Sequence, residues 1–294
     1  MSTVDIMLPY YGDVSLMQMA VRSILAQTDP DWQLTVVDDG YPDDSIPGWF
    51  ELLGDPRVRY LRNEKNLGAN ENYRRCLTLV ERDLAVMMGA DDVMLPNYIA
   101  WLRSADAEFP DADIFQPGVD VIDQFGSSND GLVDRIKRFY APKGAGRRAL
   151  SGQELAVSLL RGDWLYFPSL AWRAQRMKAV GFRHGLDVVQ DLALVLDITA
   201  AGGTLVVDDC LAFHYRRHTA SDSSWRALEG TRFIEERRYF LEIAQKMDAI
   251  GWARAARVAR RHLSSRLNAA TNLPRAVRAR NWVAVRNLVG HVSA

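Results

Sequence analysis

Short apolar runs alternate with segments of helical periodicity along the first 125 residues. Five runs are short enough for buried strands: residues 4–8, 33–37, 58–61, 84–88 and 112–116. Three longer segments carry apolar residues every three or four positions, which predicts helices: 15–27, 69–81 and 96–108. Pro96 suits the first turn of the last one. Strands that alternate with helices are typical of βαβ units, so we expect a mostly parallel sheet with helices on both faces.

The pattern changes after this first part. Residues 123–148 are rich in glycine and polar residues and predict a mobile loop over one end of the sheet. Helices at 152–161 and 188–201 and a strand from 204 to about 213 follow, and from about 225 the pattern is purely helical. We therefore expect an α/β domain over residues 1–225, with a first half to 125 and a second half over 126–225, followed by a helical extension over 226–294.

Polar residues stand at the points where the predicted strands end. The four segments are Pro9-Tyr10-Tyr11-Gly12, Asp38-Asp39-Gly40, residues 63–70 and Gly89-Ala90-Asp91-Asp92. The carboxyl ends of parallel strands share one edge of a sheet, which is where open α/β sheets bind ligands. A single Asp-Asp pair is typical of a solvated turn or a helix cap, but two pairs at successive strand ends indicate a site.

This arrangement suits a nucleotide that carries a diphosphate. One carboxylate accepts a base N–H or binds the ribose hydroxyls, and another holds Mg²⁺ or Mn²⁺, which prefer oxygen ligands and bridge phosphates. Neither G-x-x-x-x-G-K-[ST] nor G-x-G-x-x-G occurs, which argues against a P-loop enzyme and against a dinucleotide oxidoreductase.

Four segments of the chain, in order, resemble the family 2 glycosyltransferases, which have the GT-A fold. They are residues 5–40, "NLGAN" (66–70), "MGADDVMLP" (88–96), and a downstream pair made of "QDLAL" (190–194) and "LAFHYRRHTASDSS" (211–224). The resemblance covers about residues 3 to 225. It implies a Rossmann-like, mostly parallel central sheet with the nucleotide-sugar site in residues 1–125 and the acceptor and catalytic site in residues 126–225.

The resemblance also implies roles on the donor side. Pro9 and Tyr11 would line the nucleobase pocket, and Asp39 would accept the base N–H. The residues expected near the ribose and diphosphate are Asn66, Gly68, Asn70 and Asp91. Asp91 and Asp92 would bind the divalent metal, Mn²⁺ or Mg²⁺. The commoner family form is Asp-x-Asp-Asp, whereas Gly89 holds the first position here, which puts the ribose contact in question more than the metal.

Asp191 matches the position of the family's general base. In an inverting transfer one carboxylate deprotonates the acceptor hydroxyl as it attacks the anomeric carbon, while a metal offsets the charge on the departing diphosphate. Gln190 replaces the usual Glu before this position. This neutral side chain lowers the like-charge repulsion on Asp191.

The downstream segment adds further candidates. His214 and His218 are both candidates for a third metal ligand, and Arg216 matches phosphate oxygens well enough to pair with the diphosphate. Trp164, Tyr166 and Trp172 could line the acceptor side because aromatic faces suit sugar rings, although core packing explains them equally well.

Composition and charge narrow the classes of protein to which this chain could belong. The net charge of −1 argues against a nucleic-acid binder. Cys76 and Cys210 form no metal or redox motif and are typical of core cysteines in a reducing compartment. The start of the chain does not resemble a signal peptide, and no apolar run approaches the roughly 18 residues of a membrane span. These features predict a cytoplasmic protein.

The last 44 residues differ strongly in charge. From Gly251 onward there are nine arginines and no Asp, Glu or Lys, so this part carries +9 and the rest of the chain −10. We expect the helix after Gly251 to break at Pro274. The next segment carries Trp282 and several valines, and a basic amphipathic helix with Trp is typical of a peripheral element at an anionic membrane surface. Docking onto the acidic body or onto a second subunit of a homo-oligomer is an equal alternative.

Together these features predict a metal-dependent inverting glycosyltransferase. It would move a sugar from a nucleoside-diphosphate donor, with UDP favoured and dTDP or GDP as alternatives, to a hydroxyl of a glycan, a glycolipid or another lipid-linked acceptor in cell-envelope glycan synthesis. Two other classes stay open. One is an inactive GT-A-like module that binds nucleotide sugar or glycan, and the other is a sugar-nucleotide nucleotidyltransferase, whose usual glycine-rich opening is missing from "LPYYGDVS".

Overall fold

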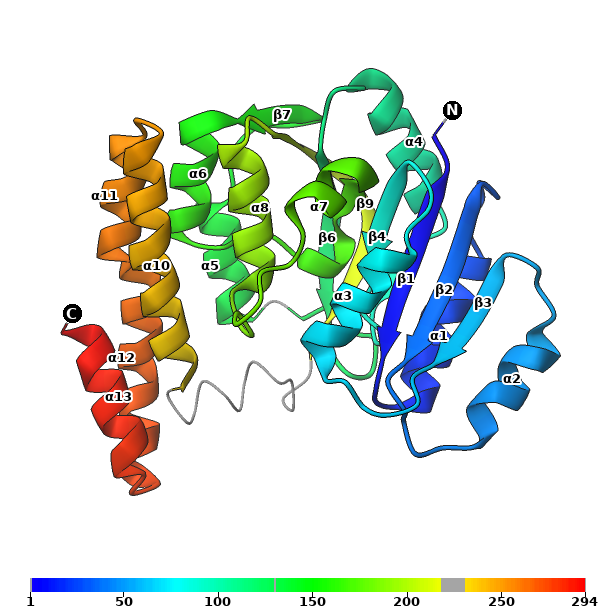
Figure 1. The fold of residues 1–294 in the computed structure, drawn as a ribbon, viewed down its shortest axis with the longest axis horizontal. Coiled ribbons are helices and arrows are strands. Elements are labelled where there is room, and N and C mark those ends of the chain that lie inside the picture. The colour runs from blue at the N-terminus through cyan, green and yellow to red at the C-terminus, as the bar shows by residue number, and fades with distance from the viewer. Residues whose placement is uncertain (1, 130, 218–230, 294) are drawn as a thin grey trace.

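A single mixed sheet forms the centre of the protein (Figure 1). The computed structural model describes residues 2–129, 131–217 and 231–293. The strand order is β3-β2-β1-β4-β8-β6-β9-β5, and β7 pairs with β9. The strands are β1 (Val4–Tyr10), β2 (Trp32–Asp38), β3 (Val58–Arg62), β4 (Leu84–Met87), β5 (Val93–Met94), β6 (Ile114–Ile122), β7 (Arg148–Ser151), β8 (Ala171–Arg173) and β9 (Thr204–Arg216). β1 to β4 are parallel, as are β6 and β9, whereas β5, β7 and β8 run against their neighbours. The prediction of a mostly parallel α/β sheet is confirmed.

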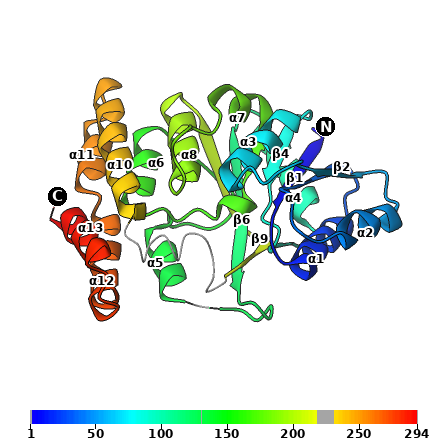
Figure 2. The ribbon, with the colours of Figure 1, turned by 60° about the horizontal axis from the view of Figure 1, so that its bottom comes forward.

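Helices cover both faces of this sheet (Figure 2). One face packs against α1 (Val14–Leu25), α2 (Ser45–Leu53) and α4 (Tyr98–Glu108). The other face packs against α3 (Ala69–Leu79), α6 (Gly152–Arg161), α7 (Ala174–Val180) and α8 (Gln190–Ala200). β1 is therefore apolar on both sides, with Ile6 and Leu8 in one core and Met7 in the other.

The register of β1, β2 and β3 brings three polar strand ends together. Tyr10 lies opposite Asp38, and Asp38 lies opposite Arg62. In Figure 1 the arrowheads of these strands point to the lower edge of the molecule, so their carboxyl ends form one rim there.

The last part of the described chain is helical: α10 (Thr231–Ala249), α11 (Ala253–Arg261), α12 (Leu263–Arg278) and α13 (Trp282–Val292). α10 and α11 bury Tyr239, Phe240 and Ala256 in the same core as α6 and α8. α12 and α13 close a small separate core with Phe233 of α10. Buried polar groups also connect these helices, because the Ser265 hydroxyl donates to Glu236 and lies 2.7 Å from Nε2 of His291.

Two predictions about the path of the chain are wrong. The C-terminal helix breaks at His262, whose φ of 31° is left-handed, and Pro274 lies inside α12. The His262 N–H bonds the carbonyls of Val258 and Ala259, so this residue ends α11 and lets α12 begin in a new direction. Residues 123–148 are also not one loop, since they contain α5 (Leu132–Tyr140) and the start of β7.

Candidate active site at the carboxyl ends of the strands

Asp38 and Asp39 follow β2 and are both buried. Asp38 accepts hydrogen bonds from the Tyr60 hydroxyl and the Tyr41 N–H. Asp39 Oδ1 accepts from Asn63 Nδ2 at 2.6 Å and Leu67 N at 2.8 Å, and its Oδ2 accepts from Gly68 N at 2.9 Å. Asp39 therefore anchors the loop between β3 and α3. Its expected contact with a nucleobase stays a prediction.

Aromatic rings line the rim beside Asp39. Tyr11 is 56% exposed, and its ring meets the ring of Tyr41 edge-on at 5.2 Å. Tyr10 is buried 5.6 Å from Tyr41, and Pro9 is partly buried. Gly40 allows this approach because its φ is +76°. Tyr11 is thus placed to stack on a planar ligand, and Tyr41 is a neighbour that the sequence patterns did not single out.

The loop from 63 to 70 borders the same rim. Asn66 is exposed, and its Oδ1 accepts from Gly68 N at 2.8 Å. Gly68 has a φ of +83° and precedes α3. Asn70 Nδ2 donates to Asp187 Oδ1 at 2.7 Å, which ties the loop to the segment before α8. The donor-side candidates Asn66, Gly68 and Asn70 therefore lie on one loop, which contacts the second half of the domain through Asp187.

Asp92 is buried beside Asp91 after β4. Its Oδ1 accepts the Arg216 N–H at 2.7 Å, whereas its buried Oδ2 has no hydrogen-bond partner. Burial and the charge of Asp91 hold the pKa of Asp92 well above its usual range. An unpartnered buried carboxylate oxygen beside a second carboxylate is a costly arrangement that a cation relieves. These two residues therefore fit a divalent metal ion with oxygen ligands.

The structure explains why Gly89 stands before this pair. A Cβ at position 89 would lie 2.4 Å from Asp92 Oδ2 and 3.0 Å from Asp91 Oδ1. The two carboxylates thus fold back over the glycine and occupy the space that a side chain would need. The first acid of the commoner family form is incompatible with this conformation.

Gly89→Ala is expected to weaken the binding of a metal and nucleotide by about tenfold and to destabilise the fold by about 1–3 kcal/mol, because the new methyl group displaces the Asp92 carboxylate. Calorimetric titration and thermal unfolding measure the two effects. Gly48→Ala in α2 is the matched control, since a Cβ there meets no atom within 4 Å. Unchanged binding in Gly89→Ala would contradict this account of the loop.

Arg216 and Arg217 clamp the end of β9 to its surroundings. Arg216 is buried, and its guanidinium donates to the carbonyl oxygens of Asp91 at 2.7 Å and Asp123 at 3.0 Å. Arg217 forms two hydrogen bonds with the buried Asp134 of α5, at 2.6 and 2.9 Å. Arg216 thus supports the Asp91–Asp92 loop through backbone groups, and its expected pairing with a diphosphate stays a prediction.

The histidine candidates are less closely connected to this site. His214 lies on β9, opposite Val93 of β5 and Asp120 of β6. His218 falls outside the described residues. Within 2–129, 131–217 and 231–293, no third His, Cys, Asp or Glu side chain joins the aspartates in a metal-binding group.

Asp191 lies in the first turn of α8 and is partly exposed. Burial and the nearby charge of Asp163 raise its pKa to about 6. The Leu192 N–H and the ammonium of Lys137 act in the opposite direction. A carboxylate with a pKa near neutrality suits a general base, because it is deprotonated at neutral pH and still holds a proton well.

The charges of both carboxylate groups act on Tyr73 of α3. Burial is the main reason that the pKa of its hydroxyl is raised, and the charges of Asp91, Asp92 and Asp191 add to the effect. Its ring packs against Phe167 and Phe182. The hydroxyl is therefore within electrostatic reach of both the predicted metal pair and the predicted base. No sequence motif marks Tyr73, and only its helical position after the 63–70 loop would suggest it.

The aromatic acceptor candidates lie deeper than we expected. Trp172 is fully buried in β8, and Trp164 is 3% exposed with its Nε1 bonded to Ser158 Oγ at 3.1 Å. Tyr166 is 8% exposed, and its hydroxyl donates to Asp134. Core packing accounts for both tryptophans, so neither presents a ring face to an acceptor. Tyr166 lies nearer the site through its contact with the ring of Tyr215.

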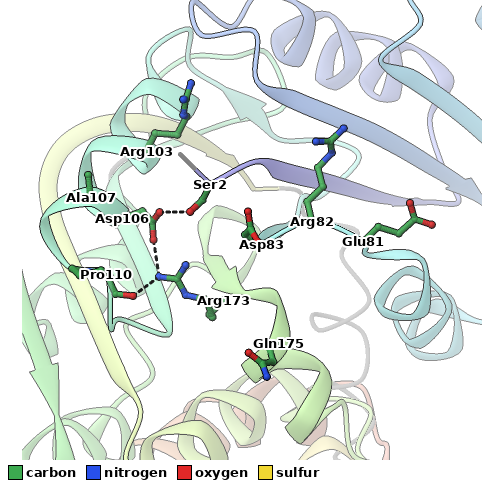
Figure 3. A pocket seen from close by; sticks show the side chains of 10 residues that line it. All are labelled: Ser2, Glu81, Arg82, Asp83, Arg103, Asp106, Ala107, Pro110, Arg173 and Gln175. Carbon is green, nitrogen blue, oxygen red and sulfur yellow. Dashed lines mark hydrogen bonds and ion pairs between the residues drawn. The ribbon is translucent and has the colours of Figure 1, made fainter.

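A cavity of about 550 Å³ lies at the opposite end of the sheet (Figure 3). Ser2 and Asp83, which precede β1 and β4, line it together with three arginines. Each arginine pairs with a carboxylate: Arg82 with Asp5, Arg103 with Asp29 and Arg173 with Asp106. Its arginines are thus paired, and it is remote from the rim of carboxylates.

The fold and the rim define a class of protein, the GT-A-type glycosyltransferases, whose sheet carries a nucleotide-sugar site at the carboxyl ends of its strands. The chain belongs to glycosyl transferase family 2, whose sequence profile matches residues 5–154. This match spans the four strand ends described above.

Two individual proteins are similar to this chain in sequence. The chain is 25% identical to the uncharacterized protein MT1568 of Mycobacterium tuberculosis (strain CDC 1551 / Oshkosh) over 245 residues, which cover 81% of this chain and 74% of that protein. It is 26% identical over 98 residues to Escherichia coli K12 WcaA, provisionally named a colanic acid biosynthesis glycosyl transferase, and this match covers 33% and 35% of the two chains.

Solved structures share the fold. TarS 1–349 of S. aureus in complex with UDP-GlcNAc superposes with a TM-score of 0.63 at 13% identity, over 82% of this chain and 66% of TarS 1–349. The structure of TarS 1–349 without a named ligand gives 0.61, with 65% of that chain covered. This chain therefore spans about two thirds of TarS 1–349, and identity this low establishes the likeness of fold alone.

Proposed function

We propose that this protein transfers a sugar, with inversion, from a nucleoside-diphosphate donor to an acceptor hydroxyl. One observation carries the proposal: the buried Asp92 Oδ2, beside Asp91 at the end of β4, has no hydrogen-bond partner, an arrangement that a bound cation relieves. A metal-and-diphosphate site next to a base of raised pKa is the arrangement that an inverting transfer requires.

The donor would lie along the rim of residues 1–125. Tyr11 and Tyr41 offer ring faces to a base, and the 63–70 loop that Asp39 anchors presents exposed polar groups to the ribose and diphosphate. Asp91 and Asp92 would hold Mg²⁺ or Mn²⁺, which when bound offsets the charge of the leaving diphosphate. A UDP-sugar is the favoured donor because the structurally similar TarS has been crystallised with UDP-GlcNAc and with UDP.

The acceptor would approach from residues 126–225. Asp191 is partly exposed there, so its carboxylate can remove a proton from an incoming hydroxyl. We propose a glycan or lipid-linked acceptor of the cell envelope, in line with the provisional name of WcaA.

A thermal-shift panel of UDP, dTDP, GDP and CDP, each with and without Mn²⁺, tests the nucleotide site. We expect UDP with Mn²⁺ to raise the unfolding temperature most, since a ligand at 100 times its Kd stabilises the folded state by about 2.7 kcal/mol. No metal-dependent shift with any nucleotide would refute the proposal. Binding of UDP-sugars without hydrolysis or transfer to any acceptor would instead favour a binding module.

A further inference from the structure

Helix α5 has its apolar side outward. Leu132, Val133, Ile136 and Phe139 share one face at helical spacing and are 67%, 54%, 46% and 73% exposed. The opposite face carries Asp134, which is fully buried. A surface helix normally buries its apolar face, so this inverted arrangement indicates a surface that another apolar phase covers.

Polar contacts fix α5 in this orientation. Asp134 accepts two hydrogen bonds from Arg217 and one from the Tyr166 hydroxyl. Lys137 donates to the Leu165 carbonyl and lies 4.8 Å above the Tyr166 ring. Rotating the helix to bury its apolar face would break all of these bonds and leave a buried carboxylate unpaired, which is costly. The outward apolar face is therefore built into the fold.

A second exposed apolar stripe lies on α13. Trp282, Val283 and Val289 are 66%, 63% and 49% exposed and fall on one helical face together with Arg286. The preceding turn adds exposed Arg278 and Arg280. None of these three arginines has a carboxylate within its own segment, because residues 251–294 contain no acid.

The helices that carry the two stripes lie on one side of the molecule. In Figure 1 the turn between α12 and α13 reaches the lower edge, toward which the arrowheads of β1, β2 and β3 also point. Figure 2 shows α5 between β6 and the α12–α13 hairpin, with all of them in the lower half of the view. Phe125, 83% exposed, follows the end of β6 at this edge.

We propose that this end of the protein docks onto an anionic lipid bilayer. Its docking surface is the apolar face of α5 with exposed Arg135 and Arg138, together with Trp282, Val283, Arg278, Arg280 and Arg286. Aromatic and aliphatic side chains flanked by arginines suit the interface, where rings enter the headgroup region and guanidinium groups meet lipid phosphates. A second protein copy with this same positive surface would repel it, so charge favours lipid.

Such docking would set the carboxylate rim toward the bilayer. No described helix is long and apolar enough to cross a membrane, so the contact would be a surface one. An acceptor hydroxyl held at the bilayer would then reach the site without leaving the membrane. This last consequence rests on the proposed function, whereas the docking itself does not.

Sedimentation of the full chain with vesicles tests the surface. We expect binding to phosphatidylglycerol-containing vesicles, weaker binding to pure phosphatidylcholine and release at high salt. The double variants Leu132→Ser/Phe139→Ser and Arg278→Gln/Arg280→Gln should each bind about tenfold more weakly. Both changes fall on exposed side chains, and circular dichroism would verify the folded state.

Matched controls come from the other end of the helical extension. Ile250 and Arg257 are also exposed, and Figure 1 shows that the α10–α11 turn lies at the edge opposite to the α12–α13 turn. Ile250→Ser and Arg257→Gln should leave vesicle binding unchanged. Equal binding by all variants, or no binding by the native chain, would overturn the proposal. Concentration-dependent self-association that Leu132→Ser/Phe139→Ser abolishes would assign the surface to a second copy. Neither readout depends on donor binding or transfer.

Discussion

Asp191→Asn is expected to lower the rate of sugar transfer by about 10²–10⁴-fold while leaving donor affinity unchanged, because it removes the proposed general base and keeps the shape of the side chain. In the native protein the base is active when deprotonated. Since burial and the charge of Asp163 raise its pKa to about 6, kcat/KM should be constant at higher pH and fall as pH decreases through about 6. Steady-state kinetics over a range of pH measure both effects.

Asp163→Asn provides the matched control. It removes a negative charge that raises the pKa of Asp191, so the acid limb of the profile should move to lower pH while the plateau rate remains. An Asp191→Asn variant with native kcat would show that another group is the base. If the decrease of kcat/KM at low pH is unchanged in Asp163→Asn, a residue other than Asp191 causes that decrease.

Asp92→Asn is expected to have two opposite effects. Metal-dependent nucleotide binding should weaken by at least about tenfold, because the site loses the carboxylate whose unpartnered oxygen would hold the proposed cation. Without metal the variant should be more stable than the native protein, because a buried charge disappears while its remaining oxygen still accepts the Arg216 N–H. Thermal unfolding with and without Mn²⁺ and UDP measures both quantities.

The pH dependence of stability separates the loss of the Asp92 carboxylate from a general loss of structure. The folded-state pKa of Asp92 is raised, so its protonation stabilises the metal-free native protein at acidic pH, and this contribution is lost as pH rises through that pKa. The stability of the Asp92→Asn variant should not show this decrease as pH rises. Asp111→Asn, a surface change outside the site, should behave like the native chain. A variant that is less stable in the absence of metal and keeps its Mn²⁺ response would contradict the metal assignment.

Strands β1 and β4 were predictable because their apolar runs are buried on both faces and are followed by polar residues. Helix α2 was missed because Pro47 and Gly48 lie within it and weaken the helical signal. Helix α5 was missed for a different reason: its apolar periodicity serves an outward face, and glycine-rich segments surround it. A method that expects apolar periodicity to indicate the core cannot recognise such an element.

The sequence indicated candidate carboxylates, but it did not indicate the contacts that they make. The positions of Asp39, Asp91, Asp92 and Asp191 follow from strand ends and family resemblance. Their contacts depend on loop paths that no local sequence pattern specifies. Examples are the hydrogen bonds of Asp39 with Leu67 and Gly68 and the hydrogen bond from Arg216 to the Asp91 carbonyl. Gly89 is instructive, because it looked like a missing acid and proved to be the space into which two others fold.

Arg216, the last residue of β9, and the adjacent Arg217 connect the proposed metal site with the proposed docking surface. Arg216 holds the Asp91–Asp92 loop, and Arg217 holds α5, whose outer face is proposed to meet lipid. A shift of α5 upon docking would therefore pull on the backbone that positions Asp92. Such coupling is reciprocal: if a bilayer raises the affinity for the metal and nucleotide by some factor, the nucleotide must raise the affinity for the bilayer by the same factor. Donor binding and membrane binding would then be linked equilibria. The protein with bound donor would stay at the membrane surface, and the protein without donor would dissociate from it.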